Sequence, residues 1–398
     1  MRFSFRALCM FLLSLGMVSA QAQDTISNRY YQIGVYNQLD LRNVSTNSVA
    51  VHRALHDGFK KGIKPRLGPK LGNITYGLFS FSTTYLTMLW SHEFGHSLRA
   101  QQVGGRFNIH NFALPYPYTT MTLPEDINLV DETLSVTGGF EVNYLQVRDL
   151  QSQFIQEDGL TNDDLALSFA NRLMFPLYTT LLIRVDPSDP NTWINTAGDP
   201  VHIVLPVFQN FANGQVFLGD GSVNPELVQF YQEAALFGTF FNLLDPNFYR
   251  EAGATFGKDK VRKPLFMVGN QERGWTYGTM FNMSPLGYEL YLRNYLHLAG
   301  QQFGFYLKYG RPFRNNGLGL SWHNMLPNQK LQLSTQLEFW EQERFGRGAS
   351  AELSLSYPLG RHFDVIAVGG YKTEGYLLGK QIGQGVNLGF NLRYYPYR

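Results

Sequence analysis

The amino-acid sequence predicts an α+β protein in which a mainly helical N-terminal region is followed by an antiparallel β-barrel of about eight strands. Three observations support this prediction: a short apolar segment at the N-terminus, a long uncharged helical segment over residues 73–103, and a regular alternation of apolar and polar residues in the last third of the chain. We expect a helical domain over residues 23–260 and a barrel-like domain over residues 270–398.

Residues 1–22 have the order of a secretory signal peptide. Arg2 and Arg6 precede a short apolar run, and Ala20-Gln21-Ala22 provides a cleavage site of small residues. The apolar run is shorter than the roughly 20 residues that cross a bilayer. We therefore expect an exported chain and exclude residues 1–22 from the fold.

Composition excludes several classes of protein. The only cysteine, Cys9, lies in the predicted signal peptide, so the mature chain would have no disulfide, no thiolate zinc ligand and no cysteine nucleophile. Without the signal peptide, 31 basic and 31 acidic residues remain, and they lack the clustered basic surplus of a nucleic-acid-binding protein. We expect no nucleic-acid partner.

Residues 73–103 are predicted to form one long helix that ends at Gly104-Gly105. No charged residue occurs between Lys70 and His92, and seven residues in this interval are Ser or Thr. We expect a buried helix whose hydrophobicity is low enough for the chain to pass through an inner membrane.

The end of this helix carries the sequence HEFGH. His92 and His96 are four residues apart on one helix face, so each can offer an imidazole nitrogen to one Zn²⁺ at about 2.0–2.1 Å. Glu93 lies beside them, where it could take a proton from a metal-bound water. The pattern predicts a zinc site that hydrolyses peptide bonds, and the alternative is a buried pair of histidines without metal. Arg99 and Gln102 occupy the positions of the glycine and third histidine of the extended motif, so a third ligand has to come from elsewhere.

Two carboxylates are candidates for the third zinc ligand. Glu141 is expected in the first turn of a helix that begins at residues 137–139, where its alternative role is to interact with the helix dipole. Asp245 follows an apolar helix, where its alternative role is an N-cap with Pro246 as the first helical residue. We slightly favour Glu141, since a buried carboxylate needs a cationic partner.

Three segments together resemble the site-2-protease-type metallopeptidases. HEFGHSLRA is similar to their H-E-x-G-H-x-x-x-A stretch, residues 139–143 to their G-x-x-x-N element, and residues 242–245, less closely, to their N-L-L…D-G segment. The resemblance covers residues 74–250 and implies His92, His96 and Asp245 as ligands, Glu93 as base, and Asn143 as a substrate-binding or structural contact. This chain departs from the family in its predicted signal peptide, its barrel-like end and the lack of a glycine after Asp245.

From about residue 274, apolar and polar residues alternate in steps of two, as in strands with one apolar face. Eight segments have roughly the 9–11 residues that cross a tilted bilayer span: 275–283, 287–298, 303–310, 317–325, 330–340, 349–357, 363–371 and 385–395. The last segment resembles the assembly signal of outer-membrane barrels at Asn387, Gly389, Leu392 and Tyr394, although the chain runs on to Arg398. We expect a barrel in the outer membrane of a Gram-negative bacterium, and a soluble all-β domain is the alternative.

Two long connections, 106–135 and 186–226, are predicted to form the walls of a substrate cleft, with His202 and His110 as polar contacts. An eight-stranded barrel is filled by its own side chains, so we expect an anchor and not a channel. The sequence thus predicts a zinc metallopeptidase of the cell envelope that acts on protein or peptide substrates. The alternatives are an outer-membrane binding or assembly protein with a structural zinc or none, and an inner-membrane protease whose strands form a soluble domain.

Overall fold

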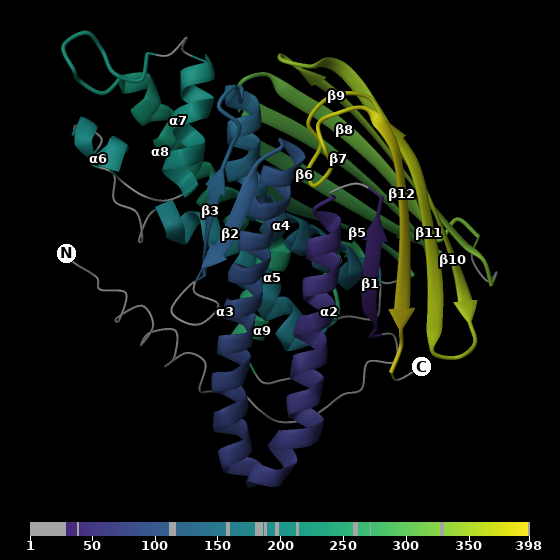
Figure 1. Cartoon of the computed structure of the whole chain (residues 1–398). Helices are drawn as coiled ribbons and strands as arrows, with labels where there is room; N and C mark the ends of the chain where they lie inside the picture. Colours follow the sequence, from purple (N-terminus) through teal and green to yellow (C-terminus); the bar gives the residue numbers. More distant parts are fainter. Residues whose placement is uncertain are drawn as a thin grey trace.

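The computed structural model of the chain describes residues 29–37, 40–110, 117–156, 160–179, 186, 189–195, 199–211, 215–257, 262–270, 272–326 and 330–396. The fold is α+β, with helices lying on the concave side of one large antiparallel sheet (Figure 1). The predicted signal peptide lies outside the described residues. No helix in the described part of the chain combines the length and apolarity needed to cross a membrane.

The helices are α2 (Arg42–Gly58), α3 (Gly68–Gln102), α4 (Leu129–Gln156), α5 (Asn162–Leu177), α6 (Pro190–Asn195), α7 (Asp199–Phe211), α8 (Pro225–Leu244) and α9 (Pro246–Thr255). A π-helical turn, η1 (Phe59–Ile63), and a 3-10 turn, η2 (Lys64–Leu67), join α2 to α3 in a long hairpin that projects beyond one end of the sheet (Figure 1). The predicted long helix is confirmed, and it ends before Gly104, whose positive φ of 77° suits a helix terminus.

The large sheet has the strand order β1-β12-β11-β10-β9-β8-β7-β6-β5-β4. Its strands are β1 (Tyr31–Tyr36), β4 (Val268–Gly269), β5 (Arg273–Ser284), β6 (Gly287–Leu298), β7 (Gln301–Pro312), β8 (Asn315–His323), β9 (Gln332–Gln342), β10 (Gly346–Leu359), β11 (Phe363–Lys372) and β12 (Gly385–Tyr394). All eight predicted C-terminal strands are confirmed, whereas β1 and β4 were not predicted. A separate hairpin, β2 (Arg106–His110) and β3 (Tyr118–Thr122), lies beside α3.

The predicted closed barrel is wrong, because helices cover both edges of the sheet. Along β1, Gly34 N donates to Asn47 Oδ1 of α2 (2.9 Å) and Asn47 Nδ2 donates to the Gly34 carbonyl (3.2 Å), as a neighbouring strand would. Along β5, Thr279 N donates to Asp245 at the junction of α8 and α9 (3.1 Å). These helices occupy the positions where a further strand would pair, and the described strands form an open ten-stranded sheet with β1 and β4 at its ends.

The helices and the sheet share one hydrophobic core across the predicted domain boundary. Phe140 of α4 packs on Phe175 of α5, with ring centroids 5.2 Å apart. Phe175 in turn lies 4.9 Å from Phe281 of β5, which also contacts Tyr144 of α4. The described structure is therefore held together by contacts between its two halves, and β1 from the N-terminal half completes the sheet.

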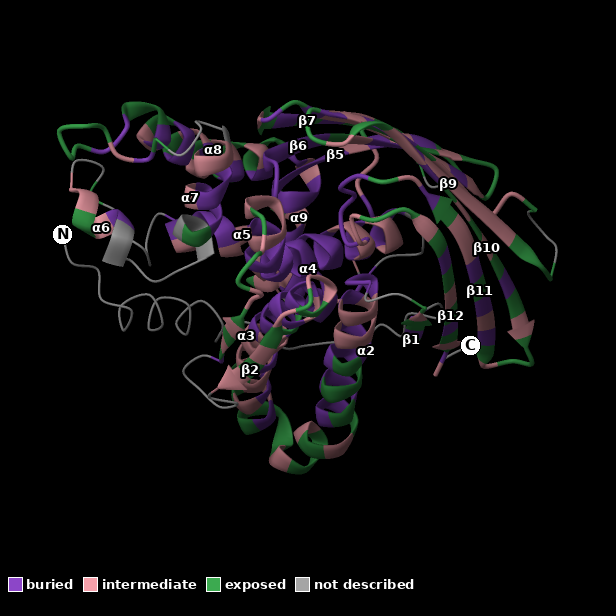
Figure 2. Ribbon diagram, turned by 45° about the horizontal axis from the view of Figure 1, so that its top comes forward, coloured by how far each residue is buried: buried purple, intermediate pink, exposed green. Residues whose placement is uncertain are grey.

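Exposed residues alternate with buried or intermediate ones along β10–β12 (Figure 2), and the two faces of the sheet differ in polarity. On the concave face, buried Glu289 accepts hydrogen bonds from Tyr291 Oη (2.8 Å) and Lys308 Nζ (3.1 Å). By strand register, the convex face exposes apolar side chains of β1 and β6–β12, each between 39% and 66% exposed: Ile33, Val35, Leu292, Leu296, Phe305, Leu307, Leu318, Leu320, Phe339, Leu353, Leu355, Phe363, Val386, Leu388, Phe390 and Leu392. A soluble sheet usually turns its apolar face inward, so this polarity is inverted.

A buried network of charged groups holds α2 against α5. Arg53 Nε lies 2.7 Å from Asp164 Oδ1, and Lys60 Nζ lies 2.6 Å from Asp163 Oδ2. Fully buried His52 contacts the Asp163 carbonyl oxygen at 3.2 Å. Burial, followed by the neighbouring His56, lowers the pKa of His52 to about 3.

We predict that the protein loses stability as the pH falls from about 6.5 toward 4. The unfolded chain binds a proton on His52 near pH 6.5, whereas the folded chain does so only near its lowered pKa of about 3. The contribution of neutral His52 to the free energy of unfolding is therefore complete above pH 6.5. It falls by at most about 1.4 kcal/mol per pH unit below that pH. The free energy of unfolding, measured with urea at each pH, should fall less steeply with decreasing pH in His52→Gln than in wild type. Equal slopes in wild type, His52→Gln and the exposed control His202→Gln would contradict the prediction.

Candidate metal centre

The HEFGH segment lies where α3 and α4 cross in direct backbone contact. A Cβ added to Gly95 would collide with the carbonyl oxygen of Gly138, and a Cβ added to Gly138 would collide with that of Gly95. Only glycine permits so close an approach. The prediction that a helix begins at residues 137–139 is therefore wrong: α4 runs from Leu129 through both glycines, and they serve helix packing.

His92 and His96, the histidine pair, converge on Gly139. Both side chains are buried on one face of α3, as predicted, with ring centroids 4.7 Å apart. A Cβ added to Gly139 would lie 2.5 Å from Nε2 of each histidine. Both nitrogens therefore approach Gly139 closely from one side, and any larger residue at this position would displace the two imidazoles.

Hydrogen bonds at the other ring nitrogens orient both imidazoles. His92 Nδ1 donates to Asn143 Oδ1 (2.7 Å), and His96 Nδ1 donates to the Ser135 carbonyl oxygen (3.1 Å). Since a carbonyl oxygen only accepts, each Nδ1 carries the proton and each Nε2 presents a lone pair. Metal-binding histidines are usually held in this way.

A chain of side-chain amides fixes the orientation of Asn143. Its Nδ2 donates to Asn171 Oδ1 (2.6 Å), Asn171 Nδ2 donates to Gln146 Oε1 (2.8 Å), and Gln146 Nε2 donates to Ser48 Oγ (2.5 Å). Each amide therefore directs its oxygen back toward the histidine pair. The structure gives fully buried Asn143 a structural role, and its contact with substrate stays a prediction. Asn171 and Gln146 carry no local sequence signal and were not predicted.

Glu93 is mostly buried beside the histidine pair, with 8% of its surface exposed. Its carbonyl oxygen accepts hydrogen bonds from Ser97 Oγ (2.9 Å) and from Thr119 Oγ1 of β3 (3.3 Å). The β2–β3 hairpin therefore lies against the turn of α3 that carries Glu93, in a connection predicted to be a loop.

Glu141 has a structural role in the described fold. Its carboxylate is fully buried and accepts hydrogen bonds from Arg99 Nε (3.1 Å), Thr137 Oγ1 (3.1 Å) and the Gly379 backbone N–H (3.1 Å). Arg99 also donates to the Lys380 carbonyl oxygen (2.9 Å). The buried carboxylate has the cationic partner that it was expected to need, but this partner is an arginine.

Asp245 is the N-cap of α9, its predicted alternative role. It accepts a hydrogen bond from Asn247 N (2.8 Å), and its carboxylate pairs with Arg172 (2.9 Å). It also accepts from Gln151 Nε2 (3.0 Å), which lies twelve residues after Gly139 on α4. Twelve residues span about 18 Å of helix, so Asp245 lies far from the histidine pair.

Neither predicted third ligand joins the histidine pair. In the described ranges, no group of three or more His, Cys, Asp and Glu side chains lies close enough to hold a metal ion. His202 is exposed on α7, and His110 of β2 hydrogen-bonds to Thr120 (2.8 Å), so substrate contacts by these histidines stay predictions. The described site consists of two converging imidazoles with Glu93 beside them.

Comparison of the chain with protein-family models, with curated proteins and with solved structures finds no match. The site is therefore interpreted from its own geometry.

We predict that Asp245→Asn destabilises the fold by about 3–5 kcal/mol, because it leaves Arg172 without its full charge partner in a buried position. Urea unfolding would measure the loss, with exposed Asp220→Asn as control. The folded fraction of Asp245→Asn should bind as much zinc per chain as the wild-type protein. Loss of zinc with unchanged stability would make Asp245 a ligand after all.

We also predict that Gly138→Ala lowers the free energy of unfolding by at least about 1–3 kcal/mol, because its Cβ would push α3 and α4 apart. Gly253→Ala in α9 is the matched control, since a Cβ there meets nothing within 4 Å. It should be neutral or stabilising by up to about 1 kcal/mol. Equal effects of the two substitutions would exclude a close helix contact.

Proposed function

We propose that the protein is a zinc-dependent peptidase. The observation that carries the proposal is the approach of Nε2 of both His92 and His96 to Gly139, with both Nδ1 atoms hydrogen-bonded to oxygen acceptors. Two imidazoles held in this way suit zinc, for which neutral histidine is a common ligand. The donor set fits the metal, although a third protein ligand is not assigned.

His92 and His96 would hold the metal, and bound zinc would supply a water of lowered pKa and polarise the scissile carbonyl. Glu93 would accept the proton of the attacking water and donate it to the leaving amine. Asn143 and the Ser135 carbonyl oxygen accept from Nδ1 and so orient the two imidazoles with Nε2 directed at one point.

A structural zinc in a binding or assembly protein is the second candidate. Structural zinc sites close their coordination with four protein ligands, whereas catalytic sites keep a position open. The described residues bring two histidines and no further ligand to this point. This number is smaller than either kind of site uses, but Glu93 beside the pair favours the catalytic site, because a structural site has no use for a general base.

We infer that the convex face of the sheet contacts the acyl chains of a bacterial outer membrane. The exposed side chains of this face are apolar, and the concave side is polar, as in outer-membrane barrels. Strands β5–β12 have from 9 residues (β8) to 14 residues (β10), which is enough for the roughly 9–11 residues of a tilted bilayer span. Monomeric soluble proteins rarely expose so large an apolar surface. A protein or peptide substrate would then be cleaved at the membrane.

The resemblance to site-2-protease-type enzymes supports the proposal in part. Two of the three similar segments, HEFGH and residues 139–143, meet at the histidine pair. The third, which ends at Asp245, lies elsewhere in the fold. A different residue would therefore complete the coordination of the metal.

Zinc content and proteolysis of an unstructured protein such as casein test the proposal. Wild type should contain one zinc per chain, and His92→Ala should contain none. Glu93→Gln should keep its zinc and lose activity by about 10²-fold or more, because a general base is removed. Glu272→Gln, a matched substitution at an exposed position before β5, should retain both.

Absence of zinc from the wild type would exclude the metal site. Zinc-loaded Glu93→Gln with wild-type activity would exclude Glu93 as base. Zinc-loaded wild type without proteolysis of any substrate would favour the structural site.

A further inference from the structure

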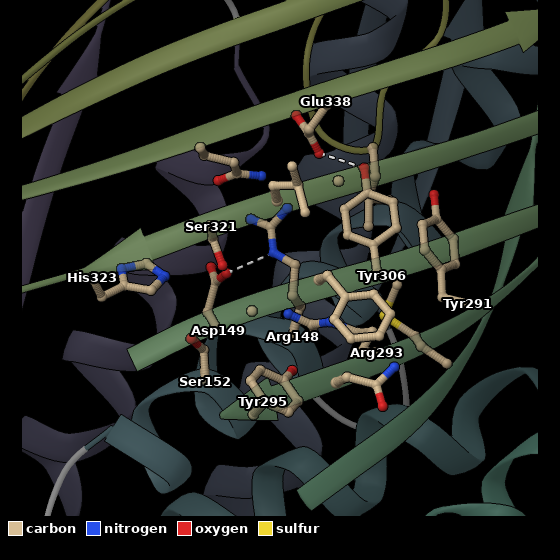
Figure 3. A pocket seen from close by; sticks show the side chains of 18 of the residues that line it. Arg148, Asp149, Ser152, Tyr291, Arg293, Tyr295, Tyr306, Ser321, His323 and Glu338 are labelled. Atoms are coloured by element: carbon tan, nitrogen blue, oxygen red, sulfur yellow. Dashed lines mark hydrogen bonds and ion pairs between the residues drawn. The ribbon is translucent and has the colours of Figure 1, made fainter. Parts of the chain in front are cut away.

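A cavity of about 160 Å³, lined by several charged and polar side chains, lies between α4 and the concave face of β6–β9. Figure 3 shows its wall, where Arg148 and Asp149 of α4 meet Arg293 and Tyr295 of β6. The side chains of Arg148 and Asp149 keep 22% and 27% of their surface exposed, so the cavity is accessible from solvent. It is separate from the histidine pair, none of whose residues lines it.

The carboxylates in the wall already have cationic or hydroxyl partners. Asp149 Oδ1 accepts a hydrogen bond from Arg148 Nε (3.0 Å). Glu338 accepts from Tyr306 Oη (2.6 Å) and lies 3.8 Å from Lys380 Nζ. Neither carboxylate is therefore available to neutralise a further cation.

Arg293 is that further cation. No carboxylate oxygen of the described residues lies within 4.0 Å of its guanidinium, although the guanidinium carbon lies 5.3 Å from the centre of the Tyr295 ring. Buried arginines elsewhere in the fold pair with a carboxylate: Arg53 with Asp164, and Arg99 with Glu141. The cavity thus keeps one positive charge without a counterion from the described protein.

Two hydrogen-bond donors at this point also lack an acceptor. Arg293 Nη1 and Tyr295 Oη are both buried and have no hydrogen-bond partner among the described residues. Leaving a buried donor unsatisfied costs about 1–3 kcal/mol, and more for a charged group. A ligand with negatively charged oxygens would accept from both and neutralise the guanidinium.

We propose that this cavity binds a small oxyanion, the carboxylate or phosphate group of an organic molecule, with Arg293 as the anion-binding residue and Tyr295 as second donor. Arg148, already paired with Asp149, lines the accessible side of the site. The proposal does not depend on the proposed peptidase activity, because it rests on residues of α4 and the sheet that do not contact the histidine pair.

The test is thermal unfolding of the full chain in detergent at constant ionic strength, with chloride replaced stepwise by acetate or by inorganic phosphate. A ligand that binds only the folded state raises Tm along a saturable curve. Saturation with acetate alone identifies a carboxylate, and saturation with phosphate alone a phosphate group. Phosphate also stabilises proteins non-specifically, but that effect does not saturate and is shared by all variants.

Arg293→Gln should weaken binding by about tenfold or more, and Tyr295→Phe by about fivefold, as expected for loss of a charged and of a neutral hydrogen bond. Arg314→Gln is the matched control, since its side chain is 59% exposed between β7 and β8. If Arg293→Gln fails to fold, Tyr295→Phe alone tests the anion site, because this substitution keeps the ring and removes only the hydroxyl. A wild type without saturable stabilisation by either anion, or variants that bind as tightly as wild type, would overturn the proposal.

Discussion

The backbone contact between α3 and α4 determines the geometry of the proposed metal site. Gly95 and Gly138 let the two helices touch, and this contact brings Gly139 opposite the ring nitrogens of His92 and His96. It also places Asn143 and Ser135 within hydrogen-bond distance of the same two rings. A larger residue at the crossing would move the histidines away from the groups that orient them. The site therefore depends on α4 as much as on the HEFGH segment.

The shape of the sheet follows from the same helical core. Because α4 and α5 pack against β5 and share its apolar core, the sheet curves around the helices without closing on itself. Its edges are bound by Asn47 on one side and Asp245 on the other, where a closed barrel would pair two strands. Asp245 thus completes the sheet edge, which explains why this carboxylate is unavailable to a metal. A convex apolar face remains, and the concave face of β7–β12, away from this core, is polar, as in a membrane barrel.

Features that are visible within one helix or strand were predicted correctly. Features that depend on contacts between residues far apart in the sequence were not. The alternation of side chains located the eight C-terminal strands because a period of two is visible within one strand. It could not indicate β1, whose Gln32 hydrogen-bonds to Asn391, 359 residues away. Likewise, the four-residue spacing placed both histidines on one helix face. The role of Glu141 depended on Arg99, 42 residues away. Gly138 and Gly139 suggested a helix start because glycine has a low helix propensity, but in the structure helix packing overrides this propensity.

X-ray absorption at the zinc K-edge of the purified protein would test the central claim most directly, because it reports which atoms surround the metal. The geometry at Gly139 predicts zinc with two imidazole nitrogens at about 2.0–2.1 Å, oxygen in the remaining positions and no sulfur. Zinc bound without imidazole, or no zinc in protein purified from zinc-replete cells, would contradict it. The converging histidines would then be part of the helix packing alone.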